Sequence, residues 1–337
     1  MRHIRKTLVS VVALAAAMLA VPLGANAANP GPAGDIAFVR SGNIYIANPG
    51  HPAVQATTGG NYAWPKFFPG GITGLAFLYK GNVWTGDLDE SGKLHPEQQV
   101  SFSGHVGAPS WSPDGSELAY IYSPNGFNET MFIARFGSSG DAVAAANREP
   151  AARRVISMTS RQVGPSAAQP DSGAAWSSQS KSFNVAWSPN GEGIAFPGGD
   201  CTGIFDNCLS VVDLATNVER TITAFSGGGN VTVGYATNPA WTADSAHLMW
   251  NQQTSDDDGT APNTPLQVWQ SNLDGTDPVM IGNNYDSEPA PSPAADGSRL
   301  VAGAHNSQLW VIEIAPNGHR TALYFGSEPD WGSATVV

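Results

Sequence analysis

The sequence contains little charge. Asp, Glu, Lys and Arg together make up 13% of its 337 residues, about half the share found in an average soluble protein. Intrinsically disordered chains combine high charge with few aromatic residues, whereas this chain has 10 Trp and an aromatic content of 9%. It also lacks a glycine at every third position and a heptad repeat, which excludes collagen and coiled-coil folds. These absences favour a folded globular chain.

Motifs of common catalytic sites are missing too. The chain has no Gly-x-Ser-x-Gly segment, the nucleophile turn of α/β-hydrolases. It has no His-Glu-x-x-His segment and no glycine-rich phosphate-binding loop before a helix. The segment Asp87–Gly92 copies the first half of a calcium loop, but Gln98 occupies the position of the closing Glu. We therefore predict no cofactor and no metal, and interpret Asp87–Gly92 as a hairpin turn.

Cysteine is nearly absent. The only two cysteines are Cys201 and Cys208, and their spacing is too wide for a Cys-x-x-Cys redox or zinc motif. We expect them to form a disulfide that closes one hairpin loop of an exported protein.

Only the first residues contain a long apolar run. Arg2, Arg5 and Lys6 precede the apolar segment Leu8–Leu23, and a small-x-small cleavage signal ends at Ala27. This order is typical of a secretory signal peptide, which we predict to span residues 1–27. The alternative is a membrane anchor, but the run is shorter than the ~20 apolar residues of a span. We expect a secreted or extracytoplasmic protein, in the periplasm or cell envelope, without stable membrane insertion.

The predicted mature chain of 310 residues is acidic. Cleavage of the predicted signal peptide removes three basic residues and no acidic one, so the formal net charge falls from −12 to −15. Nucleic acids and anionic lipid surfaces repel such a chain. We therefore exclude nucleic acid as a partner.

In contrast, turn-forming residues are abundant, and they belong to a repeat. Residues 109–115 read Pro-Ser-Trp-Ser-Pro-Asp-Gly, and related segments occur near residues 187–191 and 239–245. Weaker copies lie at 65–71, 289–297 and 329–332, so the aromatic position falls at 67, 111, 187, 241 and 331, with Pro at 291. A period of 40 residues or more with several short strands per unit is typical of a β-propeller.

Each unit predicts four strands, and six units predict an all-β, six-bladed β-propeller in one domain, 28–337. The predicted blades are 35–60 completed by 328–332, then 62–101, 107–160, 184–224, 238–281 and 288–325. The C-terminal segment Pro329–Trp331 supplies the strand that the first blade lacks and closes the ring. The alternative fold is a β-sandwich, which predicts no fixed relation between the chain ends.

The repeat resembles the TolB-type, WD40-like propeller family, whose blades carry Pro-x-Trp-Ser-Pro-Asp-Gly followed by an apolar strand. Residues 112–115 and 188–191 match this pattern best. The resemblance implies the fold, while propellers of this type occur in binding proteins, peptidase domains and lyases alike.

The long segments all fall on one predicted face of the ring, which we call the interblade face. They either connect blades or join the second and third strands of a blade, and long loops on a rigid scaffold often carry function. The alternatives are neutral drift of surface loops and, for Asp256–Gly259, a solvated acidic loop. The candidate binding residues on this face are His105, Asn128, Asp206, Asp256, Asp258, Tyr285 and His305.

From these patterns we predict an exported, non-catalytic binding or assembly module. It acts through its interblade face on a protein or on a cell-envelope or polysaccharide ligand, and we expect it to be a monomer. The alternative is a secreted polysaccharide lyase or hydrolase with carboxylate and His residues on the same face. A third possibility is a structural component of the cell wall.

Overall fold

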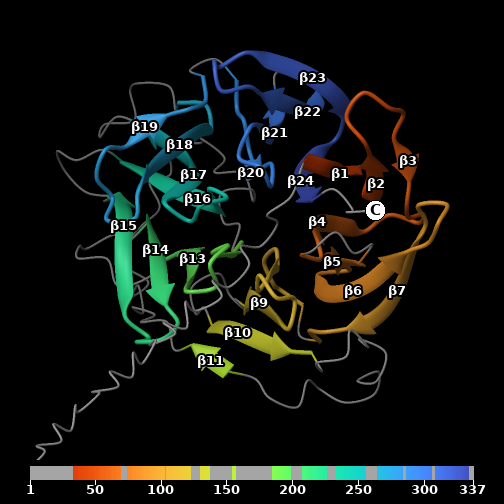
Figure 1. Ribbon diagram of the computed structural model, residues 1–337, viewed down its shortest axis with the longest axis horizontal. Helices are drawn as coiled ribbons and strands as arrows, with labels where there is room; N and C mark the ends of the chain where they lie inside the picture. The colour runs from red at the N-terminus through yellow and green to blue at the C-terminus, as the bar shows by residue number, and fades with distance from the viewer. Residues whose placement is uncertain are drawn as a thin grey trace, which may run out of the picture.

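The computed structural model is a ring of six β-sheets around a central axis (Figure 1). It describes residues 33–69, 74–102, 104–122, 130–136, 154–156, 184–198, 207–225, 233–255, 264–283, 286–305 and 308–333. In this part of the chain each sheet has four antiparallel strands. The predicted six-bladed propeller is therefore confirmed. No helix among these residues is long and apolar enough to cross a membrane.

Each blade extends outward from the axis through four strands. The first three sheets are β24 (Ser327–Ser333), β1 (Ala33–Arg40), β2 (Asn43–Ala47) and β3 (Val54–Gln55); β4 (Tyr62–Phe67), β5 (Gly74–Tyr79), β6 (Asn82–Leu88) and β7 (Leu94–Gln99); β8 (Ser110–Trp111), β9 (Glu117–Tyr122), β10 (Thr130–Arg135) and β11 (Arg154–Ile156). The other three are β12 (Ala186–Trp187), β13 (Gly193–Pro197), β14 (Asn207–Asp213) and β15 (Glu219–Phe225); β16 (Val233–Trp241), β17 (His247–Ser255), β18 (Gln267–Asn272) and β19 (Val279–Met280); β20 (Ser292–Pro293), β21 (Leu300–His305), β22 (Leu309–Ile314) and β23 (Arg320–Phe325).

The hydrophobic core lies between the blades. Successive side chains of a strand point to opposite faces of its sheet, and here both faces meet a neighbouring blade. In β1, Ile36 packs toward the sixth blade, whereas Ala37 packs toward the second blade, and both are fully buried. Burial on both faces explains why the second strands contain consecutive apolar residues, such as 36–39 in β1 and 75–78 in β5, rather than an alternating pattern.

The C-terminal strand closes the ring, as the sequence predicts. β24 pairs with β1 and places Trp331 opposite Ile36. The Trp331 side chain is 2% exposed, and its Nε1 donates to the carbonyl oxygen of Gly34 at 3.0 Å. Its backbone N–H donates to Ser292 Oγ of the sixth blade, while Asp330 accepts from the backbone N–H of Phe67 in the second blade. The last strand therefore joins three blades.

The sixth copy of the repeat differs from its predicted alignment. Trp111 pairs with Leu118 and Trp241 with Leu248, and the residue that pairs in this way with Leu300 is Pro293. The prediction of Pro291 at the aromatic position is wrong by two residues. The alignment failed because two prolines flank Ser292, and only the strand register tells them apart.

The Ser-Pro-Asp-Gly segments form the turns predicted for them. Asp114 accepts hydrogen bonds from the Ser112 hydroxyl at 2.6 Å and from the Ser116 backbone N–H at 3.0 Å. These bonds hold the pKa of Asp114 below its ordinary value although burial opposes them. Asp89 in the segment Asp87–Gly92 makes comparable bonds to the N–H groups of Ser91 and Lys93. That segment is thus a hairpin turn whose carboxylate is already occupied by its own loop.

Candidate functional site: the inner ring of the interblade face

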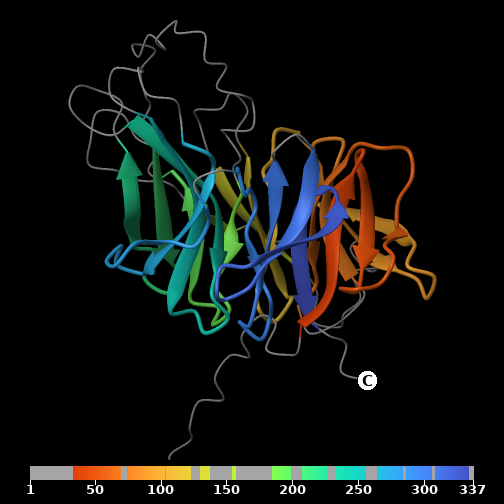
Figure 2. The ribbon, with the colours of Figure 1, turned by 90° about the horizontal axis from the view of Figure 1, so that it is seen from above.

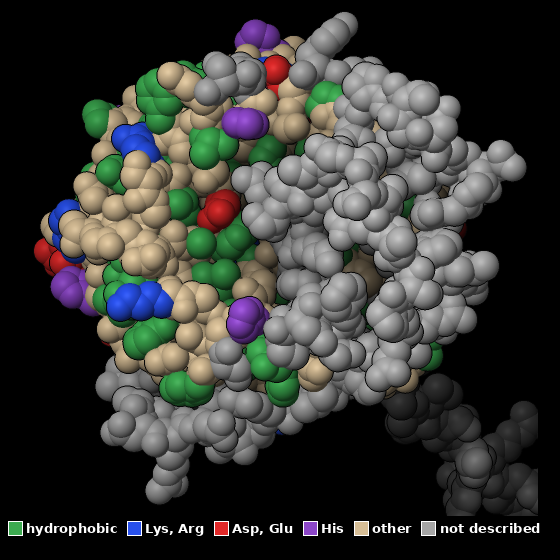
Figure 3. All heavy atoms as spheres, turned by 180° about the vertical axis from the view of Figure 1, so that it is seen from behind, with side chains coloured by type: hydrophobic (Ala, Val, Ile, Leu, Met, Phe, Trp, Pro, Cys, Tyr) green, Lys and Arg blue, Asp and Glu red, His purple; other side chains and the backbone are tan. Residues whose placement is uncertain are grey.

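The segments that connect blades share one face of the ring with the turns between second and third strands. The Tyr62 backbone N–H donates to the carbonyl oxygen of Gly42, and the Gly60 N–H donates to Asn43 Oδ1. The same arrangement links Gly104 to Asn82 in the next blade. Figure 2 shows the ring from its side, and Figure 3 shows the interblade face. The remaining turns lie on the opposite face because adjacent strands are antiparallel.

Two of the seven predicted binding residues belong to the described part of the chain, and both are exposed. His105 follows the Gly104–Asn82 hydrogen bond between the second and third blades, and His305 ends β21 in the sixth blade. No contact brings these two histidines together in that part of the chain, and no group of three potential metal ligands occurs there. The other five, Asn128, Asp206, Asp256, Asp258 and Tyr285, lie outside the described residues.

The signal peptide and half of the predicted disulfide also lie outside the described residues. Residues 1–27 are not described, and neither is Cys201. Cys208 is buried in β14 and is not a free cysteine. The Cys201–Cys208 disulfide stays a prediction.

Six equivalent residues lie in or just before the innermost strands and surround the axis on the interblade face. Each lies three positions before the aromatic position of its blade, or before Pro293, and we call them the inner ring. They are Trp64, Ala108, Asn184, Asn238, Ala290 and Glu328. Figure 3 shows an acidic side chain near the centre of this face, among hydrophobic side chains, with histidines farther out.

Amide side chains connect the third to sixth blades within the inner ring. Asn184 Oδ1 accepts from the Ala108 backbone N–H at 2.8 Å, and its Nδ2 donates to Asn238 Oδ1 at 2.7 Å. Asn238 Nδ2 donates in turn to Asn251 Oδ1, which also accepts from the Ala290 N–H. All of these side chains are buried. Because an amide both donates and accepts, the amide arc meets its own hydrogen-bonding needs without charge.

A carboxylate takes the equivalent position at the junction of the first and second blades. Glu328 Oε2 accepts from the Trp64 backbone N–H at 2.8 Å. Its other oxygen, Oε1, has no hydrogen-bond partner among the described residues, and the side chain is partly buried. Burial raises the pKa of Glu328 to about 7, opposed by the Trp64 hydrogen bond and the positive charge of Lys66. Glu328 therefore gains and loses a proton near neutral pH.

The backbone at this junction is strained. Trp64 has a φ of 50° and Glu328 has a φ of 53°, in the left-handed region that bulky non-glycine residues avoid. Two other inner-ring residues adopt a similar conformation, Ala290 with a φ of 56° and Asn238 with a φ of 49°. Asn tolerates it well, but Ala290 shows that the positive φ belongs to the ring position and not to Glu328 alone. Each such residue costs on the order of 1 kcal/mol, and strain of this kind clusters at functional sites.

Lys66 does not neutralise Glu328 by a direct ion pair. Its Nζ lies 2.9 Å from Asp330 Oδ1, on the residue two positions after Glu328 in β24. Asp330 also accepts from the Phe67 N–H. The lysine is thus committed to Asp330, and Glu328 is left with one neutral hydrogen bond.

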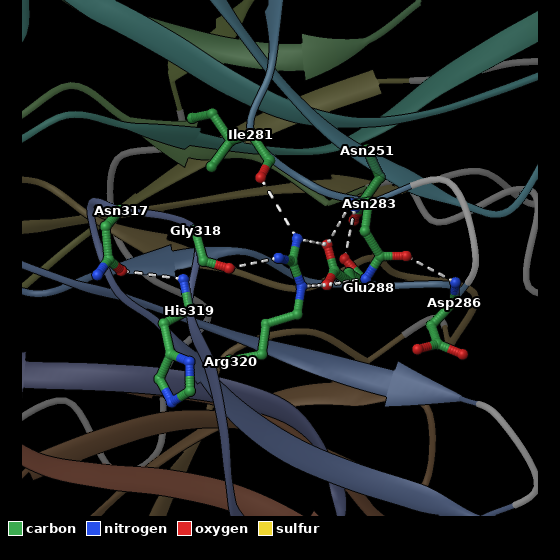
Figure 4. Close-up of polar contacts among 9 residues, drawn as sticks. All are labelled: Asn251, Ile281, Asn283, Asp286, Glu288, Asn317, Gly318, His319 and Arg320. Carbon is green, nitrogen blue, oxygen red and sulfur yellow. Dashed lines mark hydrogen bonds and ion pairs between the residues drawn. The ribbon is translucent and has the colours of Figure 1, made fainter.

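A second carboxylate near the inner ring has a very different environment. Glu288 is fully buried and forms a bidentate ion pair with Arg320 of the sixth blade (Figure 4). It also accepts from the backbone N–H and Nδ2 of Asn283. A Cβ at Gly282 would lie 2.8 Å from Glu288 Oε2, so glycine makes the close approach possible. The hydrogen bond to Glu288 raises the pKa of Arg320.

Sequence reasoning missed Glu328 as a site residue. It placed the residue in the closing segment and searched for function in the long loops. The signal that identifies Glu328 is the repeat itself: aligning the six blades gives Trp, Ala, Asn, Asn, Ala and Glu at one position. Only one of these side chains is ionisable.

Comparisons with known proteins agree on the fold. No family model matches the chain, and no curated protein matches its sequence. Among solved structures, TolB from Acinetobacter baumannii is similar at 14% identity and a TM-score of 0.60, covering 89% of this chain and 67% of that one. A putative TolB from Agrobacterium tumefaciens has 15% identity and a TM-score of 0.54, covering 88% and 90%. A chain of the nidogen/laminin complex has 9% identity and a TM-score of 0.57, covering 88% and 98%. The chain thus has the TolB-type six-bladed propeller fold.

Proposed function

We propose that this protein is an exported binding module that recognises a partner protein through its interblade face and performs no catalysis. The observation that carries the proposal is the contrast between the two faces. The turns described on the opposite face are short, and their polar groups bond to each other, as in the Asp114 turn. One connection on that face is long, residues 136–153 between β10 and β11, so the prediction that all long segments fall on the interblade face is wrong for the third blade. The interblade face presents Glu328 of an innermost strand, a carboxylate with a raised pKa that accepts one hydrogen bond among the described residues.

The comparisons support protein recognition as the class of function. Two similar structures are TolB proteins, and a third belongs to a complex of nidogen with laminin. These names describe those proteins. What they share with this chain is a rigid ring that presents loops from six blades on one face, which suits it to contact a large surface.

Site-specific photocrosslinking tests the proposal in the native host. A photoreactive residue at His105 reports on the interblade face, and one at Asn317, exposed in the turn between β22 and β23, reports on the opposite face. We expect a discrete crosslinked species from His105 and none from Asn317. Crosslinks from Asn317 alone would overturn the assignment of the face, and crosslinks from neither position would argue against a protein partner.

Export has its own test. We propose that residues 1–27 are removed and that the mature protein lies outside the cytoplasmic membrane. The intact mass of the protein purified from the cell envelope or culture fluid should correspond to a chain that begins at Ala28. A cytoplasmic protein that retains Met1 would contradict this part of the proposal.

A further inference from the structure

We propose that Glu328 and its inner-ring neighbours form a binding site for a primary ammonium group, as carried by a lysine side chain or a peptide amino terminus. This rests on the proposed function and names the chemistry that the interblade face recognises. The first observation is the free oxygen: Glu328 Oε2 bonds to the Trp64 N–H, while Oε1 has no partner among the described residues.

The environment makes this oxygen a strong acceptor for a cation. A partly buried carboxylate interacts with a positive charge more strongly than one in water, because the effective dielectric constant around it is lower. Hydrogen bonds to a charged group are also shorter and about twice as strong as neutral ones. Among the described residues Glu328 accepts one hydrogen bond, from Trp64, so an incoming ammonium group supplies what is missing.

The donor set favours an ammonium group over a metal ion. Calcium takes six to eight oxygen ligands and magnesium six, and no group of three His, Cys, Asp or Glu side chains with the arrangement of a metal site occurs among the described residues. An ammonium group has three N–H donors. One charged acceptor is enough to hold it, whereas a metal ion needs a shell of several oxygen ligands.

The surrounding charges leave Glu328 available. The strands packed against β24 include β1, β4, β20, β21 and β22. Their charged or titratable side chains, together with Asp330 of β24 itself, are Asp35, Arg40, Tyr62, Lys66, His305 and Glu313. Of these, Lys66 acts on the pKa of Glu328 through its charge. Because Lys66 is paired with Asp330, its charge weakens the attraction of Glu328 for a cation. Lys66 does not itself form an ion pair with Glu328.

The backbone amide of Trp64 is a built-in reporter of this site, because its proton points at the carboxylate. NMR of the isotope-labelled mature protein should show a Trp64 amide shift that titrates with an inflection near pH 7. Added Nα-acetyl-lysine amide binds the ionised form and lowers that inflection. At ten times the dissociation constant of the probe, the shift is about one pH unit downward.

Three controls make the result decisive. Nα,Nε-diacetyl-lysine amide has no positive charge and should leave the inflection where it is. Glu328→Gln should abolish both the inflection and the saturable response to the lysine probe. Glu90→Gln removes the same charge from an exposed turn on the opposite face, and it should behave like the parent protein.

A further probe distinguishes a lysine side chain from a peptide amino terminus as the source of the ammonium group. Glycylglycine amide at pH 7.5 carries only an amino terminus, while Nα-acetyl-lysine amide carries only the side-chain ammonium group. The tighter of the two identifies the source. Equal effects of the charged and diacetylated probes, or an unchanged response in Glu328→Gln, would overturn the proposal.

Failure of the cation site is distinguishable from failure of the proposed function. Crosslinking from His105 without any response to the ammonium probes would leave the interblade face as a binding surface and remove only the cation site. Loss of both results would remove the binding function itself.

Discussion

Glu288 and Glu328 lie in the same part of the ring, but the protein treats them in opposite ways. Glu288 receives a bidentate guanidinium and two donors from Asn283, and it is sealed from solvent. Glu328 receives one backbone N–H, and its other oxygen has no hydrogen-bond partner in the described part of the chain. A buried charge is tolerated when it is paired and hydrogen-bonded. Glu288 meets this condition and has a structural role, whereas Glu328 does not meet it.

The amide arc sharpens the contrast, because it shows what the same ring position looks like when only structure is required. At the positions equivalent to Glu328, Asn184 and Asn238 satisfy their neighbours without any charge. The positive φ is shared with Asn238 and Ala290 of the arc, so what sets Glu328 apart is its buried ionisable group, which lowers the stability of the fold when it is charged. Such residues persist where function requires them.

The largest expected effect is on the paired carboxylate. Glu288→Ala leaves the Arg320 guanidinium partly buried without its partner, so the free energy of unfolding should fall by about 3–5 kcal/mol. Denaturant unfolding followed by Trp fluorescence measures this loss. Glu288→Met combined with Arg320→Met is the matched control, and it should recover part of the stability because no charge remains unpaired. A loss below about 1 kcal/mol for Glu288→Ala would mean that the pair contributes little.

Replacing Glu328, the carboxylate without a paired cation among the described residues, should increase the stability of the protein rather than lower it. A raised folded-state pKa means that the native state holds a proton that the unfolded state has released, so stability falls as pH rises from about 4.5 to about 7. Glu328→Gln removes this penalty and keeps an acceptor for the Trp64 N–H. It should stabilise the protein by roughly 3 kcal/mol at pH 8 and by less than about 1 kcal/mol at pH 5.

Thermal melting of Glu328→Gln and its parent at both pH values measures this difference. The control is Asp330→Asn, the same kind of change two residues along the same strand. Because Asp330 is compensated by Lys66, its replacement should destabilise. Glu328→Gln variants that melt below the parent at pH 8 would place Glu328 with the structural carboxylates.

A smaller loss is expected from the amide arc. Asn184→Ala removes the acceptor of the Ala108 N–H and the Nδ2 donor to Asn238 Oδ1. The cost of such unsatisfied buried groups is about 1–3 kcal/mol. Unlike the Glu328 effect, it should not change between pH 5 and pH 8, because the arc contains no ionisable group. A pH-dependent loss would show that the arc is coupled to a titrating residue.

The same two carboxylates show which features of the structure can be predicted from the sequence. The repeat predicts six blades and ring closure because turn residues and apolar strands are local signals that recur. It misplaced the sixth aromatic position, since Pro291 and Pro293 differ only in strand register. It pointed to the interblade face but passed over Glu328, because the environment of that residue comes from Trp64 and Lys66, more than 260 positions away. The sequence shows that His105 lies in a segment between blades. It does not show that the Glu328 carboxylate has no cation paired with it in the part of the chain that the structure describes.

The smallest expected effect separates Lys66 from the other causes of the Glu328 pKa. Lys66→Met removes the positive charge that lowers this pKa, so the inflection of the Trp64 amide shift should move above pH 7. Asp330→Asn does the reverse, because it releases Lys66 from its ion pair and leaves its charge free to act on Glu328. Both shifts are modest, since the Lys66 charge is already shared with Asp330 in the parent protein. NMR titrations of the two variants therefore bracket the parent value. An unchanged inflection in both variants would mean that burial and the Trp64 hydrogen bond alone set the pKa. The Lys66–Asp330 ion pair would then serve only to join the first and second blades where the ring closes.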